Sequence, residues 1–199
     1  MNNKAMYQLT YGLFVLSARD EEQDNGCIIN TAGQVTTTPN RITIAVNKAN
    51  YTHDLIQRIG LFNISILDET APFSVFQRFG FQSGRDTDKL KDFPVSRADN
   101  GIFYLKDHAS AFLSGKVVQQ FDLGSHTLFL ADVTDGDVLS NENSVTYTYY
   151  QNNIKPKPEK TEKTGYRCKI CGYIYEGDPL PEDFICPICK HGAADFEKI

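Results

Sequence analysis

The sequence lacks four features that would each indicate a particular class of protein. No apolar run approaches the roughly 18 residues that a membrane-spanning helix needs. Positive charge is not in excess: the formal net charge is −5, which argues against a nucleic acid or an anionic membrane as partner. No G-x-G-x-x-G motif follows an expected strand, so a Rossmann-type dinucleotide site is not indicated. Cysteines are nearly absent before residue 168, where Cys27 stands alone.

The distribution of the cysteines also indicates a compartment. Secreted proteins usually spread their cysteines over scattered disulfides, whereas four of the five here lie in two closely spaced pairs, which favours a reducing cytoplasm. Near the N-terminus, the apolar stretch from Tyr11 to Ala18 is followed by no cleavage-site pattern, which favours a first strand over a signal peptide. We therefore expect a cytoplasmic protein.

The sequence changes character after residue 150. The segment QNNIKPKPEKTEKTG (residues 151–165) has two prolines, alternating charges and one aliphatic residue, so it cannot bury a core of its own. We predict a first domain over residues 1–150, a flexible linker over 151–164 and a small domain over 165–199, called the tail below. Residues 1–150 carry a formal charge of −5 and the tail carries −2, so net charge does not draw the halves together.

The first domain is predicted to be mainly β. The segments RITIAVN (41–47), FNISIL (62–67) and HTLFLADV (126–133) alternate with the period of two that half-buried strands show. Helical patterns are fewer; we expect one helix that ends at Gly60 and another over residues 71–80. Short strands with one or two helices predict a β-barrel or a β-sandwich with small helical caps.

The tail contains four cysteines with the spacing of a metal site. Two C-x-x-C pairs, separated by fourteen residues, supply Cys168, Cys171, Cys186 and Cys189. A segment of about 34 residues is too small to be held together by apolar burial alone, so a metal is expected to supply much of its stability. Four tetrahedral thiolates suit zinc or iron. The spacing alone does not choose between a structural zinc ribbon and an iron centre.

The residues that flank these cysteines favour iron. YRCKICGYIY and DFICPIC, with a Phe seven residues after the last Cys, resemble the rubredoxin family. The resemblance implies one iron that carries single electrons and backbone amides that point at the sulfurs, a pattern that Gly172 and Pro187 fit. Three features depart from the common pattern: a shorter stretch between the pairs, Phe184 in place of Trp, and Lys190 in place of Gly. Lys190 must then accept a less favourable turn conformation, at a cost of about 1 kcal/mol.

A second candidate site lies between Asn30 and Leu55. Threonines, an Asn and a Gln gather on an expected strand–turn–strand unit, and Lys48 precedes an expected helix start at Asn50–Thr52. Hydroxyls and amides can bind a flavin ring edge and its ribityl chain, and a lysine beside a helix N-terminus suits a phosphate. Threonine-rich strand edges are common, however, so on these residues alone an ordinary strand edge is the better explanation.

Four motifs of the first domain together resemble the flavin reductase-like, FMN-binding split-barrel family. They are LTYGLFVLSA, NGCIINTAGQVTTTP, NKANYTHDLI and FGFQSGRDTDKL, in the family's order. The resemblance implies a homodimeric split β-barrel with FMN bound non-covalently near the subunit interface. It implies ring and ribityl contacts from Asn30, Thr31, Gln34, Val35, Thr36 and Thr37, phosphate contacts from Asn47, Lys48, Tyr51, Thr52 and His53, and contacts to the cofactor or the partner subunit from Ser83, Arg85 and Lys89.

Two further residues have no assigned role. Cys27 is expected to be a small buried apolar residue, because no His in its local motif could activate it as a nucleophile. His126 fits the pattern of the flavin reductase-like family, and a structural role explains it equally well. No catalytic residue is predicted.

The two halves together resemble the high-molecular-weight rubredoxins of anaerobic bacteria. That resemblance implies an NAD(P)H-dependent FMN oxidoreductase that passes electrons through FMN to an Fe(Cys)4 centre and on to a flavodiiron protein that reduces oxygen or nitric oxide. A flavin accepts two electrons as hydride and can release them singly, which matches a one-electron iron held nearby by a linker. Two alternatives stay open: a free flavin or ferric reductase with a structural zinc tail, and an electron carrier that does not use NAD(P)H. The sequence does not choose between NADH and NADPH.

Overall fold

A computed structural model describes residues 2–21, 23–157 and 165–199. Seven strands form the main antiparallel sheet: β1 (Phe14–Arg19), β2 (Asp24–Ile29), β3 (Ala32–Thr37), β4 (Asn40–Asn47), β5 (Leu61–Leu67), β8 (Ala109–Asp122) and β9 (His126–Val138). The remaining strands are β6 (Ser96–Arg97), β7 (Phe103–Tyr104), β10 (Tyr166–Cys168), β11 (Ile174–Tyr175) and β12 (Phe196–Lys198). The helices are α1 (Tyr51–Ile59), α2 (Phe73–Gly80), α3 (Tyr147–Tyr149), the 3-10 helices Asn3–Gln8 and Ala193–Asp195, and the π-helix Tyr150–Ile154.

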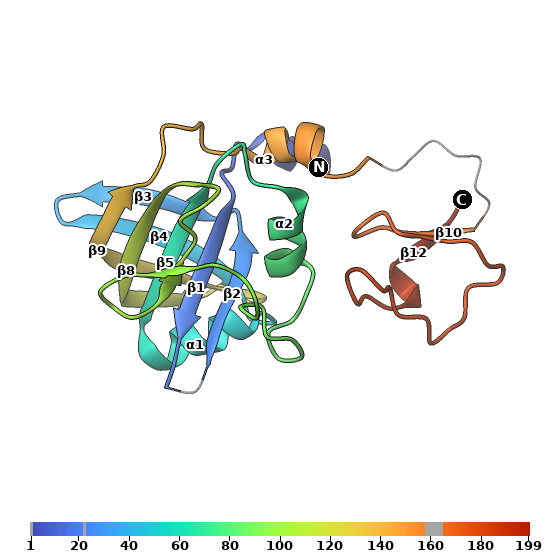
Figure 1. The fold of residues 1–199 in the computed structure, drawn as a ribbon, viewed down its shortest axis with the longest axis horizontal. Helices are drawn as coiled ribbons and strands as arrows, with labels where there is room; N and C mark the ends of the chain where they lie inside the picture. The colour runs from blue at the N-terminus through green and yellow to red at the C-terminus, as the bar shows by residue number, and fades with distance from the viewer. Residues whose placement is uncertain (1, 22, 158–164) are drawn as a thin grey trace.

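The main sheet curls around a single core (Figure 1). Its strand order is β2-β1-β5-β8-β9-β4-β3, so β2 and β4 lie far apart along the sheet. Nevertheless Ile29 of β2 and Ile44 of β4 belong to the same buried cluster, which α1 completes with Leu55 and Ile56. Burial of this apolar surface is the main driving force for closing the sheet. The prediction of a mainly β first domain is confirmed, and we call residues 2–157 of the structure the barrel.

Strand β1 is buried on both faces. Leu16 points into the barrel core, whereas Leu13 and Val15 pack on a second cluster with Phe76 and Phe79 of α2. Successive side chains of a strand point to opposite faces, so an uninterrupted apolar run marks a strand covered on both sides. Helix α2 therefore covers the outer face of β1, on the side of the barrel that faces the tail (Figure 1).

Both expected helices are present. Helix α1 begins after Asn50 and ends at Gly60, which has φ 68° and donates its N–H to the carbonyl of Ile56 at 2.8 Å. This left-handed glycine cap is the helix stop that the sequence indicated. Helix α2 begins after Pro72, whose extended backbone sets the first turn.

The hairpin of β8 and β9 extends beyond the rest of the sheet and exposes apolar side chains. The two strands contain 14 and 13 residues. Val118, Phe121 and Leu123 at the hairpin end are 44%, 44% and 56% exposed, and Val35 on β3 is 50% exposed. A grouping of this kind on strands is typical of a surface that another polypeptide covers.

The linker begins later than residue 151. Residues Tyr150–Ile154 form a π-helix, Tyr150 is buried, and Ile154 packs on the α2 cluster. The polar composition of this segment predicts a linker from residue 151, but its helical turn brings Ile154 against the α2 cluster, which composition alone does not indicate. Residues 158–164 of the predicted linker lie outside the described residues. Within the described ranges, no helix is long and apolar enough to cross a membrane.

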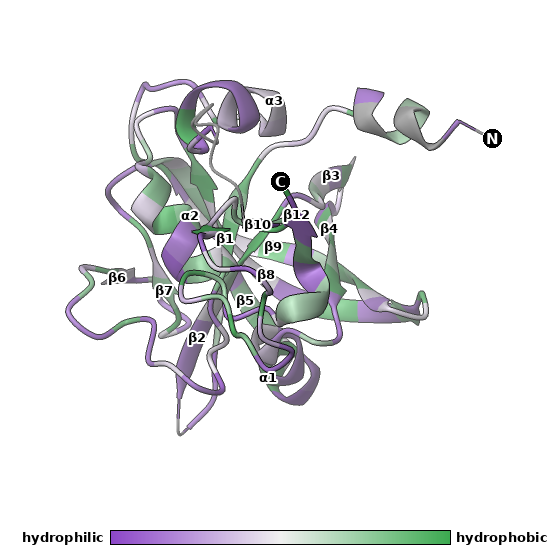
Figure 2. Ribbon diagram, turned by 90° about the vertical axis from the view of Figure 1, so that its right-hand side faces the viewer, coloured by the Kyte–Doolittle hydropathy of each residue, from purple (hydrophilic) through white to green (hydrophobic). Residues whose placement is uncertain are grey.

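The tail forms its own small sheet and core. Strand β10 pairs with β11 on one side and with β12 on the other. Its cluster joins three buried cysteines with Phe196, and Phe184 packs edge-on against Phe196 with ring centroids 5.4 Å apart. Figure 2, viewed from the side of the tail, shows β10 and β12 in front of the middle of the barrel.

Candidate metal centre and adjoining pocket

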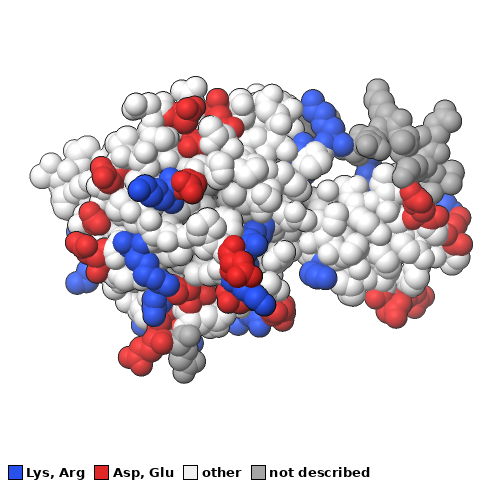
Figure 3. Space-filling model, viewed as in Figure 1, with Lys and Arg blue, Asp and Glu red and all other residues white. Residues whose placement is uncertain are grey.

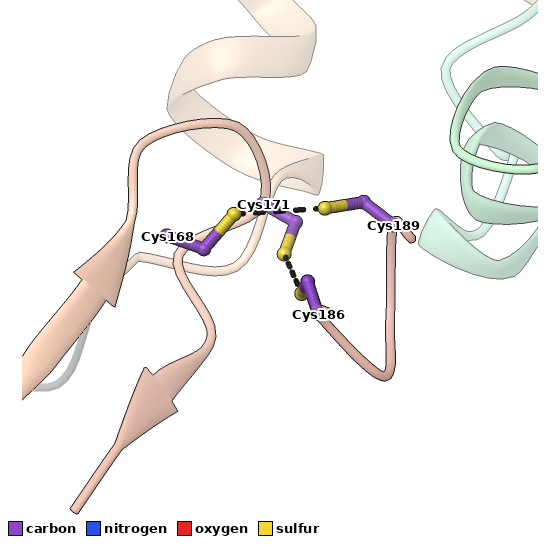
Figure 4. Close-up of side chains that lie close together, drawn as sticks. All are labelled: Cys168, Cys171, Cys186 and Cys189. Carbon is purple, nitrogen blue, oxygen red and sulfur yellow. Dashed lines mark hydrogen bonds between the residues drawn. The ribbon is translucent and has the colours of Figure 1, made fainter. Parts of the chain in front are cut away.

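Four cysteine side chains converge on one point in the tail (Figure 4). Their Sγ atoms all lie within 4.8 Å of one another, and the pairs Cys168–Cys189 and Cys171–Cys186 are 3.5 Å apart. Four thiolates placed tetrahedrally about 2.3 Å from one ion would be about 3.8 Å from each other. The donor set therefore fits a single tetrahedral zinc or iron ion.

Backbone amides point at the sulfurs, as the resemblance to rubredoxin implied. Four N–H groups donate to three of the Sγ atoms: that of Tyr173 to Cys171, those of Ile188 and Cys189 to Cys186, and that of His191 to Cys189. Hydrogen bonds of this kind stabilise the thiolate over the thiol. The loops thus supply part of the charge stabilisation that a metal-bound thiolate needs.

The two C-x-x-C loops have matching turns. The N–H of Gly172 donates to the carbonyl of Cys168 at 2.9 Å, and the N–H of Lys190 donates to the carbonyl of Cys186 at 2.9 Å. Both turn residues have positive φ, 82° at Gly172 and 63° at Lys190. Glycine adopts this conformation without strain, whereas the Cβ of a lysine comes too close to the backbone carbonyl that follows it. The expected unfavourable turn at Lys190 is therefore present.

The centre is mostly enclosed by protein. Cys168, Cys186 and Cys189 are buried, and Cys171 is intermediate. Burial raises the pKa of the Cys171 thiol to about 11. Several thiolates cannot be collected in such a place without a cation to balance them, which is the chemistry that a bound divalent or trivalent metal supplies.

A cavity of about 750 Å³ lies between the metal centre and the barrel. The start of α1 forms one wall with Asn50 and Tyr51, and the segment from Gly80 to Gly84 that follows α2 forms another. The tail contributes Cys189, with Lys190 and His191 beside it. One ligand of the metal centre therefore borders a space large enough for a cofactor.

The floor of this cavity holds a buried cation. Lys89 is 4% exposed, and its Nζ donates to the carbonyls of Gly26 at 2.9 Å and Phe79 at 3.3 Å. These bonds use two of its three donors and leave one for a ligand in the cavity. Burial lowers the pKa of Lys89 and raises that of the neighbouring Cys27 thiol. Cys27 is thus a buried thiol, as expected, and also part of the cavity floor.

Some of the predicted cofactor residues meet at this cavity. Tyr51, Ser83 and Lys89 line it. Arg85 lies over the ring of Tyr51 at 5.1 Å and pairs with Asp54 at 2.6 Å, which holds the loop after α2 against the start of α1. The fold thus brings together residues that are far apart in the sequence.

Two other predicted residues point inward and act as supports. Thr52 is fully buried and its Oγ1 accepts a hydrogen bond from Asn25, which lines the cavity. His53 is also buried, and its Nε2 lies 2.9 Å from the hydroxyl of Thr127. Neither side chain faces the cavity, so each can position its neighbours but does not reach a phosphate in this arrangement.

The residues predicted around the flavin ring lie in two different places, at the start of β3 and along its length toward the far end of the β3–β4 hairpin. Asn30 and Thr31 lie where the chain enters β3, and Thr31 Oγ1 donates to the carbonyl of Ala45 at 2.6 Å. Gln34, Val35, Thr36 and Thr37 continue along β3 to the far end of the β3–β4 hairpin, about 16 Å beyond its base at the usual rise of a strand. Gln34 lines a separate cavity of about 320 Å³ beside Ile42 and Val133. Within one chain these four residues do not join the cavity at the metal centre.

Lys48 has a partner within the protein. Its Nζ lies 2.7 Å from Asp122 Oδ1, on the exposed end of the β8–β9 hairpin. Asn47 accepts a hydrogen bond from the N–H of Ala49 and lies opposite His126 in the β4–β9 pair. A phosphate at Lys48 would therefore have to displace a carboxylate or bind beside it.

Several lining residues were not predicted from the sequence. Asn25 falls within the NGCIINTAGQVTTTP motif and Asn50 within NKANYTHDLI, and Gln82 and Thr87 fall within FGFQSGRDTDKL, so the motifs indicated these segments without assigning the four residues to a cofactor. His191 of the tail has no such signal, because its place at the cavity depends on how the tail packs on the barrel.

Comparison with known proteins gives a family for each half. Residues 6–157 match the model of the flavin reductase like domain. Residues 166–197 match the model of the rubrerythrin, rubredoxin-like domain. The first match runs into the segment predicted as a linker, as far as residue 157, and the second begins just after that segment.

Two curated proteins and one solved structure show what the chain is similar to as a whole. A high molecular weight rubredoxin of Moorella thermoacetica is 37% identical over the full length of both chains. A ferric-chelate reductase (NAD(P)H) of Archaeoglobus fulgidus is 31% identical over 85% of this chain and all of its own. Among solved structures, an NADH:FAD oxidoreductase of Streptomyces globisporus superposes with a TM-score of 0.66 at 17% identity, over 72% of this chain and 84% of its own. At that identity the structure supports the split-barrel fold alone.

Proposed function

This chain belongs to the flavin reductase-like family and ends in a rubredoxin-like domain, and from this premise we propose that electrons enter it at FMN and leave it at iron. It is a homologue of high molecular weight rubredoxin and, by its first domain, an oxidoreductase that acts on flavin. The proposal adds the direction of electron flow and the identity of the donor, NAD(P)H, and of the metal, iron. We also propose the barrel and the tail as the two functional units.

The observation that carries the proposal is the shared cavity. Cys189, a metal ligand, lines the same space as Tyr51, predicted at the FMN phosphate, and Lys89, predicted at the cofactor or the partner subunit. A flavin bound there would supply the conversion of one hydride into single electrons. NAD(P)H gives two electrons and one proton as hydride, one further proton comes from solvent, and two iron(III) centres then accept one electron each while two protons return to solvent.

The residues of the cavity suit an FMN molecule in chemical terms. The ammonium of Lys89, with one donor left over, can hold an electron-rich carbonyl or a phosphate oxygen. Asn25, Asn50 and Ser83 add amide and hydroxyl groups at the wall. We assign the remaining predicted contacts, Asn30, Thr31, Asn47, Lys48 and Arg85, to the rim of the same site.

We further propose that the protein is a homodimer. The exposed apolar residues Val35, Phe121 and Leu123 lie on β3 and on the β8–β9 hairpin, which a second copy would cover. In a dimer, four residues that do not reach the cavity within one chain could contact the flavin or the polypeptide of the partner subunit: Gln34, Val35, Thr36 and Thr37. Size-exclusion chromatography with light scattering tests this, and Phe121→Asp should shift the mass to that of a monomer.

For the electron acceptor we propose a flavodiiron-type oxygen or nitric oxide reductase in the cytoplasm. A second candidate function is reduction of ferric chelates, favoured by the 31% identity to the ferric-chelate reductase of Archaeoglobus fulgidus. Anaerobic stopped-flow mixing with NADH or NADPH separates them. Our proposal requires bleaching of flavin absorbance and then of a thiolate-to-iron band, and it is wrong if the metal in protein from iron-replete cells is zinc or if the iron band does not bleach.

A further inference from the structure

The barrel and the tail meet at Phe81. This residue follows α2, its ring lies 5.8 Å from that of Phe73, and it packs on the cysteine cluster of the tail. Gly80 and Phe81 also line two cavities, the one of about 750 Å³ described above and a smaller one of about 250 Å³. Phe81 therefore stands at the centre of a narrow apolar contact with open space on both sides.

On the tail, the contact is made by the two metal-binding loops. Ile170, which precedes the ligand Cys171, lines the smaller cavity together with Phe81 and Tyr150. In the other loop, Cys189 lines the larger cavity. Figure 4 shows Cys189 on the side of the centre next to α2. The loops of Cys171 and Cys189 thus form one edge of the centre, called the sulfur edge below, and this edge faces the barrel.

The other side of the metal centre is covered by the tail itself. Cys168 and Cys186 are 1% and 0% exposed, and both belong to the core cluster with Phe196. On the face shown in Figure 3, the acidic side chains of the tail lie at its far end and on its lower edge, and none lies where the tail meets the barrel. The sulfur edge is therefore the short route to the metal.

Building on the proposed function, we propose that Phe81 is the dock at which the tail takes electrons, and that the tail delivers them through the same sulfur edge. While the barrel covers this edge, a second protein cannot approach it closely, so the tail has to leave Phe81 between the two steps. Each visit reduces one iron(III) to iron(II), and each departure returns it to iron(III) by one-electron transfer to an acceptor protein. Two visits discharge the two electrons of one hydride, and two protons return to solvent.

Three substitutions separate the two uses of the sulfur edge. Phe81→Asp alters the barrel side of the contact, and Ile170→Asp alters the tail side. Ile185→Asp is the matched control, because Ile185 also precedes a ligand cysteine and is 55% exposed. Each variant is first checked for its iron absorption band, and Phe81→Ser replaces Phe81→Asp if the charged variant does not fold.

Two rates are measured on the full-length protein loaded with FMN and iron. Internal transfer is the bleaching of the iron band after rapid reduction of the flavin by NAD(P)H. Delivery is the reduction of oxidised cytochrome c by protein whose iron has been reduced with a stoichiometric amount of dithionite. A carboxylate placed in the apolar contact should lower the docked fraction of the tail, and with it the rate of internal transfer, by about tenfold or more.

The proposal expects a different outcome from each variant. Phe81→Asp should slow internal transfer and leave delivery equal or faster, because the tail spends more time free. Ile170→Asp should slow both rates, and Ile185→Asp should stay within about twofold of the wild type in both. If Phe81→Asp transfers electrons from flavin to iron at the rate of the wild type, the proposal that the tail docks at Phe81 is wrong. Unchanged delivery in Ile170→Asp would show that the acceptor uses another edge.

A second measurement does not depend on electron transfer. In protein loaded with zinc, which is redox-inactive, hydrogen exchange of the amides at residues 80–84 and 189–191 should be faster in Phe81→Asp than in the wild type and in Ile185→Asp. Equal exchange in all three would overturn the dock. If the wild type passes no electrons from flavin to iron, the proposed function fails, and the exchange measurement still decides whether the tail sits on Phe81.

Discussion

Cutting the connection between the two halves should turn a rapid intramolecular transfer into a slow bimolecular one. The cut is best made in the folded protein, by a site-specific protease whose recognition sequence is inserted between residues 158 and 164. This position spares Ile154, which packs on the α2 cluster. Each half keeps its own buried core, so neither should depend on the connection to stay folded.

The size of the effect follows from the length of the connection. Nine residues, 157 to 165, separate Pro156 from Tyr166. If they behave as the solvated coil that their composition predicts, their ends are about 17 Å apart on average. A short tether of this kind gives an effective concentration of order millimolar. At 1 µM cleaved protein, transfer from flavin to iron should therefore be about 1000-fold slower than in the intact chain.

The assay is anaerobic stopped-flow reduction by NAD(P)H, followed at the flavin and iron bands. Flavin reduction should not change on cleavage, whereas the rate of iron reduction should fall in proportion to dilution. In intact protein both rates should be independent of dilution. A cleaved sample that keeps a fast, dilution-independent iron step would refute the reasoning, because the halves would then hold together without their tether.

Four further predictions concern individual residues and the metal. Purified protein should be red and contain one iron per chain, and chelation of the metal should abolish the near-ultraviolet circular dichroism of the tail while leaving that of the barrel. If Lys48 binds the FMN phosphate, Lys48→Ala should weaken FMN binding by about 1–3 kcal/mol. Asp122→Asn should strengthen FMN binding, because the Asp122 carboxylate competes with the phosphate for the Lys48 ammonium. Isothermal titration of FMN into the apoprotein measures both dissociation constants, and unchanged values would place the phosphate elsewhere. Lys190→Gly should raise the stability of the metal-loaded tail by up to about 1 kcal/mol in guanidinium unfolding, because it relieves a left-handed backbone. Burial raises the pKa of the Cys27 thiol above its ordinary 9.0, so this thiol ionises at a lower pH in the unfolded chain than in the folded one. The stabilisation that comes from this difference is fully present below about pH 9 and is lost as the pH rises above it. The urea midpoint should therefore fall more steeply between about pH 8 and pH 10 in the wild type than in Cys27→Ala.

The metal site could be predicted from the sequence almost completely. Cys168, Cys171, Cys186 and Cys189 were identified by spacing alone, because a C-x-x-C turn fixes its own geometry within a few residues. The strain at Lys190 was also foreseen, since the turn demands one backbone conformation whatever residue occupies it. Local chemistry of this kind does not depend on the rest of the fold.

The cavity that we propose for FMN was predicted less completely, because its parts come from distant segments. The loop that contains Ser83 and Lys89 was indicated by a motif, and the fold brings it to Tyr51. Thr52 and His53 were predicted as phosphate contacts, and in this structure both side chains are buried, with His53 beside the hydroxyl of Thr127. A polar residue at a helix start has two possible directions, and only the packing of the neighbouring strands decides between them.

The contact at Phe81 has no signature in the sequence. The residue appears only as one more aromatic in FGFQSGRDTDKL, and Ile170 as one of several apolar residues next to a cysteine. Both become significant when the tail is placed against α2. Packing between two separate cores leaves no periodic pattern in either, so it must be read from the structure.

The narrowness of this contact matches the alternation that we propose. Two apolar side chains such as Phe81 and Ile170 contribute at most about 3–6 kcal/mol when fully buried, and association costs offset much of that. The net gain is then at most about 4 kcal/mol, so the dissociation constant is about 1 mM or weaker, no tighter than the effective concentration that a short tether supplies. A substantial fraction of the tails would then be free at any time, so the delivery of electrons to an acceptor would not be held up. A larger or charged interface would raise the docked fraction and slow delivery in proportion. A weak dock and a short tether are therefore the combination that keeps both steps fast.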